Sequence, residues 1–169
     1  TTLQADAAGN IYIASWKGGE YTYKGEDVGY IALVRSPAAQ KAAAPSPFPS
    51  ATAPATEWVR QLAAPSHSRR LAAQRALLRQ PADALAAAGA LRDLLQTTDL
   101  AQPARLAVLA TLAQVLGPDA HGDLTRVAAT DPQLKEAAIR LIGDRPADAP
   151  AGSTPLLVAA LQDPNDHVK

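Results

Sequence analysis

The residues of this chain that could carry chemistry are few and far apart. His67, His121 and His167 are its only histidines, and a single carboxylate one helical turn away, as Asp163 is from His167, does not by itself make a metal-ligand motif. Ser66 and His67 are adjacent, but the side chains of neighbouring residues diverge and so do not form a nucleophile–base pair. The histidines are therefore predicted to be solvated or capping side chains, with His67 and His167 at turns between helices.

Two small groups near the N-terminus are weak candidates for a binding site. Glu26 and Asp27 are adjacent carboxylates in a glycine-containing turn and could contribute to a calcium site, although no third oxygen ligand accompanies them in sequence. Trp16, Lys17 and Tyr21 could line a cofactor pocket. The simpler interpretation is a solvated turn for the carboxylates. For Trp16 it is packing against a neighbouring sheet, with Lys17 in solvent.

A basic run follows further along the chain. Arg69, Arg70, Arg75 and Arg79 fall in a segment with helical spacing, and on one helix face they could dock an acidic partner. More often such a run is a solvated helix face whose long side-chain stems cover alanines. The sequence leaves both interpretations open.

The composition excludes several classes of function. The 169 residues carry 16 basic and 16 acidic side chains, which argues against nucleic-acid binding and against a polybasic membrane surface. The chain has no cysteine, so it cannot hold a disulfide, a thiolate metal site or a covalently attached c-type haem. No apolar run is long enough to form a transmembrane helix, so no membrane span is expected. The chain also lacks methionine, and we expect it to be a mature or excised part of a longer protein.

Residues 1–35 predict strands that belong to a larger β domain. Aromatic and β-branched residues separated by glycine turns indicate strands at Ile11–Trp16, Glu20–Tyr23 and Tyr30–Val34. Two or three short strands are marginally stable alone in water, so we expect a further sheet to cover them.

Residues 36–56 predict an extended tether. This segment holds five prolines and no helical period, which favours a semi-rigid, partly polyproline conformation. Phe48 is the single phenylalanine of the chain, and we expect it to dock into a neighbouring groove.

Residues 57–169 are rich in alanine and leucine and repeat with a period. Asp99, Asp131 and Asp163 are evenly spaced along the chain, and helical spacings of apolar residues flank each position. We therefore expect antiparallel helix pairs, with turns near residues 65, 99, 131 and 163.

Two prolines predict where helices begin. Pro132 and Pro164 fit the first helical position, where a backbone N–H is not needed, and the preceding Asp131 and Asp163 can cap the helix.

These patterns predict a mainly α fold: a short HEAT-like α-solenoid preceded by a few β-strands. Stacked helix pairs share a core that no single pair could bury, and we expect Leu95, Leu112 and Leu141 to be buried between pairs. The sequence "TPLLVA" at residues 154–159 matches an ankyrin signature but occurs once. An ankyrin-like array and an irregular bundle remain alternatives.

Two stretches carry a resemblance to a known family. "GNIYIASWKGGEYTYKGEDVGYIALV" resembles the closing blade of a bacterial β-propeller related to the glucose/sorbosone dehydrogenases. "PFPSATAPATEWVRQLAAPSHSRRLAAQRALLRQ", residues 47–80, resembles the linker and first helix pair that follow this propeller in large extracytoplasmic, membrane-bound-type dehydrogenases. The resemblance covers residues 10–80, and beyond residue 80 it is a general likeness to HEAT repeats.

The resemblance implies the order propeller, HEAT repeats and, often, a c-type cytochrome domain. The parent protein would then be a periplasmic or secreted oxidoreductase that uses pyrroloquinoline quinone, calcium and haem c. Its catalytic residues would lie mostly on other blades, and its Cys-X-X-Cys-His motif would follow Lys169.

Two functional hypotheses follow. In the first, this chain is a non-catalytic scaffold that positions the propeller relative to an electron-transfer domain or partner, and its own partners are the remainder of the propeller or another chain. In the second, it is a stand-alone HEAT-repeat module for protein–protein interaction with no redox role.

Overall fold

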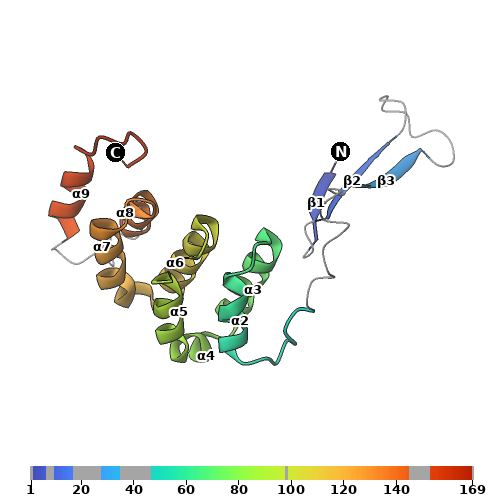
Figure 1. The fold of residues 1–169 in the computed structure, drawn as a ribbon, viewed down its shortest axis with the longest axis horizontal. Coiled ribbons are helices and arrows are strands. Elements are labelled where there is room, and N and C mark those ends of the chain that lie inside the picture. Colours follow the sequence, from blue (N-terminus) through green and yellow to red (C-terminus); the bar gives the residue numbers. More distant parts are fainter. Residues whose placement is uncertain are drawn as a thin grey trace. The chain divides into compact units, whose positions relative to one another are not determined.

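The structure, a computed structural model, describes residues 2–6, 10–16, 28–34, 47–97, 99–144 and 153–168. Within these residues the chain is mainly helical and contains a small three-stranded antiparallel sheet (Figure 1). The chain divides into two compact units, one comprising Thr1–Phe48 and Ser66–Arg69, the other Pro49–Pro65 and Arg70–Lys169.

The first unit contains an antiparallel meander of β1 (Thr2–Ala5), β2 (Ile11–Trp16) and β3 (Gly29–Val34), with β2 in the centre. Asp6, directly after β1, is joined to Asn10, directly before β2: its carboxylate accepts hydrogen bonds from the backbone N–H of Asn10 at 2.9 Å and from the Asn10 side-chain amide at 2.8 Å. A short Asp or Asn side chain bonded to nearby backbone is a common way to fix a turn.

The sequence pattern found two of these strands. The predicted strand Ile11–Trp16 is confirmed, and β3 contains the predicted Tyr30–Val34. The predicted strand Glu20–Tyr23 lies outside the described residues. β1 falls in a segment to which the pattern assigned no strand, and it is held by its pairing with β2, where Leu3 lies opposite Ile13.

Apart from residues 67–69 at the start of one helix, which belong to the first unit, the second unit contains the helices. They are α2 (Ala55–Leu62), α3 (His67–Arg79), α4 (Pro81–Ala86), α5 (Ala88–Leu95), α6 (Gln102–Leu116), the 3₁₀ turn η1 (Gly117–Ala120), α7 (His121–Thr130), α8 (Lys135–Gly143) and α9 (Thr154–Ala160). α2 begins at Ala55, two residues before the predicted start of the array, because Pro54 holds an extended conformation immediately before it. No helix of the described residues is long and apolar enough to cross a membrane.

The helices recur at a regular spacing. α2, α5, α7 and α9 begin at residues 55, 88, 121 and 154, with the same interval between successive starts. α3, α6 and α8 each follow one of the first three as a second helix. α5 packs on α6, α7 on α8, and α8 on α6 and α9. A period close to that of the three aspartates is therefore present in the arrangement of the helices.

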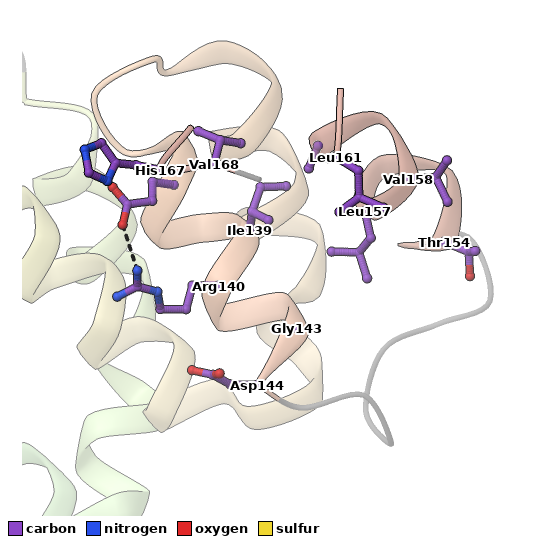
Figure 2. Close-up of a pocket in the computed structure, with 12 residues that line it drawn as sticks. Ile139, Arg140, Gly143, Asp144, Thr154, Leu157, Val158, Leu161, His167 and Val168 are labelled. Atoms are coloured by element: carbon purple, nitrogen blue, oxygen red, sulfur yellow. Dashed lines mark hydrogen bonds and ion pairs between the residues drawn. The ribbon is translucent and has the colours of Figure 1, made fainter. Parts of the chain in front are cut away.

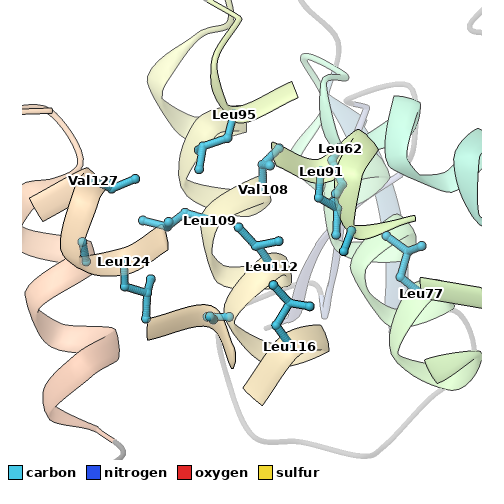
Figure 3. Packing of buried hydrophobic residues seen from close by; sticks show 14 of the residues in the cluster. Leu62, Leu77, Leu91, Leu95, Val108, Leu109, Leu112, Leu116, Leu124 and Val127 are labelled. Carbon is cyan, nitrogen blue, oxygen red and sulfur yellow. The ribbon is translucent and has the colours of Figure 1, made fainter. Parts of the chain in front are cut away.

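One core runs through the helical unit. Its most deeply buried side chains come from several helices and include Leu62, Leu77, Leu91, Leu109 and Leu112 (Figure 3). The buried Thr111 donates its hydroxyl to the Ala107 carbonyl at 2.7 Å, one turn earlier, so that this polar group is satisfied inside the core. The predicted burial of Leu95 and Leu112 is confirmed, whereas Leu141 is only partly buried and lies at the edge of the core.

The predicted role of two prolines is wrong. α8 begins at Lys135, three residues after Pro132, and Asp163–Val168 form turns in which Pro164 begins no helix. The Asp131 carboxylate instead accepts a hydrogen bond from the N–H of Gln133 at 3.0 Å, which makes a tight turn ahead of the helix. Prolines do occupy the first turn of α4, α6 and α9, at Pro81, Pro103 and Pro155.

Candidate functional site

The sheet has two apolar faces. The strand register places Leu3, Tyr30 and Val34 on one face and Tyr12, Ile31 and Leu33 on the other, with Ile11 and Ile13 on the first face in the central strand. Except for Ile11 and Ile13, all of these side chains are exposed, from 38% for Tyr12 to 75% for Ile31. Antiparallel sheets commonly present one apolar and one polar face, so exposed apolar side chains on both faces indicate a sheet that two further layers can cover.

Most of the predicted N-terminal site residues cannot be placed. Lys17, Tyr21, Glu26 and Asp27 lie outside the described residues. Trp16 is described: it ends β2 opposite Gly29 and is partly buried. The cofactor pocket and the calcium site therefore stay predictions from the sequence.

The basic run is divided between the interior and the surface. Arg70 is 8% exposed, and its guanidinium donates to the carbonyl oxygens of Ala64 at 2.8 Å and Pro65 at 2.7 Å, in the turn that joins α2 to α3. Arg75 and Arg79 are exposed on α3. Arg70 thus holds a turn together, and only Arg75 and Arg79 present their side chains as a docking surface would require.

Arg69 has a different environment. It is buried, and its guanidinium lies over the Phe48 ring, 4.8 Å from the ring centroid. A guanidinium over an aromatic face is attracted by the ring's negative charge density. Phe48 remains 41% exposed, so the Arg69 stack takes the place of the groove that the sequence predicted for this ring.

The structure gives His121 a specific role. Its Nε2 lies 3.0 Å from the Ser153 hydroxyl and 3.2 Å from the Thr125 hydroxyl, so it is no simple solvated histidine. A serine–histidine contact of this length is also what a nucleophile–base pair requires. Ser153 is buried, however, and no carboxylate of the described residues hydrogen-bonds to His121. The contact therefore ties the start of α9 to the start of α7, one repeat earlier.

Polar contacts of this kind link the second helix pair to the third and the third pair to the segment of α9. They join residues 26 to 32 positions apart: Arg92 with Asp123, Gln102 with the Gln133 carbonyl, His121 with Ser153, Arg105 with Asp131, and Lys135 with Asp163. Asp163 repeats the turn made by Asp131, because its carboxylate accepts from the N–H of Asn165 at 2.9 Å. The two Asp-Pro positions are therefore equivalent in contacts as well as in sequence. His121 and Ser153 are separated by the same interval as Asp131 and Asp163, so this repeat was the sequence signal that could have predicted their contact.

An apolar groove lies between α8 and α9. It has a volume of about 510 Å³, and its walls include Ile139, Leu157, Val158, Leu161 and Val168 (Figure 2). Its rim carries charge: Glu136 and Arg140 form an ion pair of 2.8 Å one turn apart on α8, and Asp144 and His167 complete the rim. The groove is large enough for side chains of a bound helix, and the sequence pattern did not predict it.

Two features of the chain bear on the calcium and haem that the resemblance implies. The described residues contain no group of three or more histidine, cysteine or carboxylate residues that could hold a metal ion. Covalent haem attachment needs cysteine, which the sequence lacks. We therefore derive no catalytic step for pyrroloquinoline quinone, calcium or haem c from these residues.

Comparisons with known proteins leave the family open. No family model matches the chain, and searches of curated proteins and of solved structures found no significant match.

Proposed function

We propose that this chain is a non-catalytic scaffold segment of a propeller-type oxidoreductase. The strands β1–β3 would form part of a propeller blade, and the helices α2–α9 a short HEAT-like α-solenoid that positions the propeller relative to an electron-transfer domain or partner. The parent would be extracytoplasmic and would bind its cofactors outside this segment.

The observation that carries the proposal is the pair of apolar faces on the sheet. In a propeller each blade packs between two neighbouring blades, so both of its faces must be apolar. Leu3 on one face and Ile31 on the other are exposed by 65% and 75%, which is the pattern expected of a blade without its neighbours. The resemblance of residues 10–34 to a closing blade points to the same arrangement.

The helical part of the proposal has separate support. Evenly spaced helix starts and polar contacts between successive helix pairs are the features of a stack in which each unit contacts its neighbours. A unit of this length is shorter than a standard HEAT repeat, so the likeness is to a short form.

The first test is the gene sequence on either side of this segment. Five or more propeller blades upstream and a Cys-X-X-Cys-His motif downstream would support the scaffold role. Flanking sequence with neither feature would contradict it and favour the second hypothesis, a stand-alone helical-repeat interaction module. The groove between α8 and α9 is the observation that favours this alternative.

A second test uses the whole protein. If both faces of the sheet are covered, Leu3→Asp and Ile31→Asp should each strongly reduce the yield of folded, dye-linked dehydrogenase. Leu85→Asp on α4 is the matched control, because Leu85 is 54% exposed in the helical unit. Normal yield and activity for either sheet variant would show that one face stays in solvent, which a propeller blade does not allow.

A further inference from the structure

The positive charge of the helical unit is concentrated on the second helix of each pair. The first helices α2, α5 and α7 each carry one carboxylate and one arginine, and α9 carries no charged residue. α6 has one arginine and no acidic residue, α8 has two basic residues and one acidic residue, and α3 has four arginines and no acidic residue. The second helices are therefore basic, and α3 is the most basic of them.

On α6 and α8 the chain neutralises these charges itself. Each basic side chain of these two helices forms an ion pair, either with an aspartate in a turn further along the chain or with a carboxylate on the same helix. The pairs are Arg105 with Asp131, Lys135 with Asp163, and Arg140 with Glu136.

The arginines of α3 have no such carboxylate partners among the described residues. Arg69 stacks on Phe48 and Arg70 donates to backbone carbonyl groups, so both are held within the chain. Arg75 and Arg79 are exposed, and no carboxylate in the described part of the chain forms an ion pair with either of them. Their charge is therefore left for solvent or for a partner.

These two arginines share one face of α3 with an exposed leucine. Arg75 and Arg79 lie one helical turn apart, and Leu78, which is 40% exposed, lies between them on the same face. The buried residues in this part of α3 lie on the other side of the helix, and they are Ala73, Ala76 and Leu77. An apolar side chain beside two guanidinium groups offers both burial and hydrogen-bond donors, and arginine is enriched where proteins bind each other.

We propose that Arg75, Leu78 and Arg79 bind an acidic segment of a partner protein, in which carboxylates flank an apolar side chain. Charge complementarity favours this occupant, because guanidinium groups bind carboxylates through paired hydrogen bonds and the chain's own carboxylates already neutralise α6 and α8. The zero net charge of the chain does not favour a nucleic acid. This inference adds a docking face to the helical unit and rests on its charges rather than on the propeller, so either can fail alone.

The probe is a synthetic acidic peptide that forms an amphipathic helix, with glutamates on both sides of a row of leucines. Labelled peptide is titrated with the purified chain and followed by fluorescence anisotropy. We expect saturable binding that weakens as salt is added and that Arg75→Glu reduces by about tenfold or more. Arg60→Glu is the matched control, since Arg60 is exposed and has no ion pair among the described residues but lies on α2. The same change of net charge there should leave the affinity nearly unchanged.

Several outcomes would overturn the proposal. Absence of saturable binding would show that this face of α3 is simply solvated, and an equal loss in Arg60→Glu would show only general attraction between charges. Equal binding of a peptide with the same composition in scrambled order would show that the apolar row next to Leu78 is not recognised. Tighter binding of an oligouridylate that also depends on Arg75 would assign the face to a nucleic acid. Circular dichroism checks that both arginine variants keep their helix content, as expected for exposed side chains.

Discussion

Arg70 shows how a single side chain can stabilise the start of the helical unit. The carbonyl groups that follow a helix C-terminus have no partner within the helix and must find donors elsewhere. In the turn after α2, Arg70 supplies donors to two successive carbonyl groups, those of Ala64 and Pro65. A cation at this position is also favoured by the partial negative charge at the C-terminal end of α2.

Replacing Arg70 by methionine should therefore destabilise the protein. The substitution keeps an unbranched apolar stem but removes both hydrogen bonds, and a loss of about 1–3 kcal/mol is expected. Arg75→Met is the control, because Arg75 is exposed on the same helix and its replacement should change stability by less than about 0.5 kcal/mol. The measurement is urea unfolding followed by circular dichroism. Equal stability of the two variants would show that water replaces the guanidinium without loss.

Gly117 provides a second prediction at this scale. It follows α6 with φ 57° and ψ −127°, a combination that side chains with a Cβ rarely adopt. Gly117→Ala should cost about 1–3 kcal/mol through backbone strain, since no atom lies within 4 Å of the added Cβ. Gly122→Ala, within α7, should instead stabilise by about 0.5–1 kcal/mol. Thermal unfolding of the two variants should shift in opposite directions, and a shared direction would contradict the strain argument.

At the scale of elements, the centre of α6 supports the whole helical unit. Val108, Leu109 and Leu112 are fully buried, and α6 contacts elements on both sides of it, from α2, α4 and α5 to α7 and α8. Shortening a side chain there leaves a cavity, because the surrounding structure relaxes only partly.

Leu112→Ala should accordingly cost about 2–5 kcal/mol, the usual range for a fully buried leucine. Leu85→Ala removes the same atoms from a residue that is 54% exposed and should cost less than about 1 kcal/mol. Guanidinium unfolding monitored by circular dichroism compares the two variants. A small effect of Leu112→Ala would show that the helices are loosely packed.

Elements with a strong periodic pattern were predictable from the sequence. The strand Ile11–Trp16 and the helical region were found because alternation and helical spacing are local properties. β1 was missed because its alternating pattern, Thr-Leu-Gln-Ala, is only four residues long and the strand depends on pairing with β2. Pro132 was misassigned because a proline after aspartate suits a tight turn as well as a helix start.

The candidate site depended more on tertiary structure. The arginine run gave four candidate docking residues, but which of them point inward depends on how α3 packs, so the role of Arg70 could not be predicted from the sequence. The groove between α8 and α9 has no linear motif, because Ile139, Leu157 and Val168 come from three separate segments. Only the periodic recurrence of Asp131 and Asp163 indicated that the segments around α8 and α9 are equivalent.

For the whole molecule, the scaffold proposal predicts a chain without redox chemistry of its own. The purified chain should show no Soret band after expression with a cytochrome c maturation system, because it has no cysteine to attach haem. It should also show no dye-linked sugar dehydrogenase activity with added pyrroloquinoline quinone and calcium. Turnover above a heat-denatured control would place an active site in this chain and contradict the proposal.

The sheet gives the most demanding prediction, because it tests the proposed blade directly. Exposed apolar groups on both faces leave little burial to resist opening, and the edges β1 and β3 each have an unpaired row of backbone groups within the described sheet. In a monomer, the amides of Ile11, Ile13 and Ile31 should therefore exchange with solvent quickly while those of α6 are protected. Association that covers the sheet should slow the exchange of these three isoleucine amides.

The experiment is hydrogen exchange measured by nuclear magnetic resonance at two protein concentrations, with the oligomeric state checked by light scattering. We expect protection at Ile31 to increase with concentration and to be lost in Ile31→Asp, because a carboxylate on this face opposes its burial. Slow exchange of all three isoleucine amides in a verified monomer would show that the strands are stable without further layers. The two apolar faces would then need no neighbouring blades, and the propeller proposal would have to be abandoned.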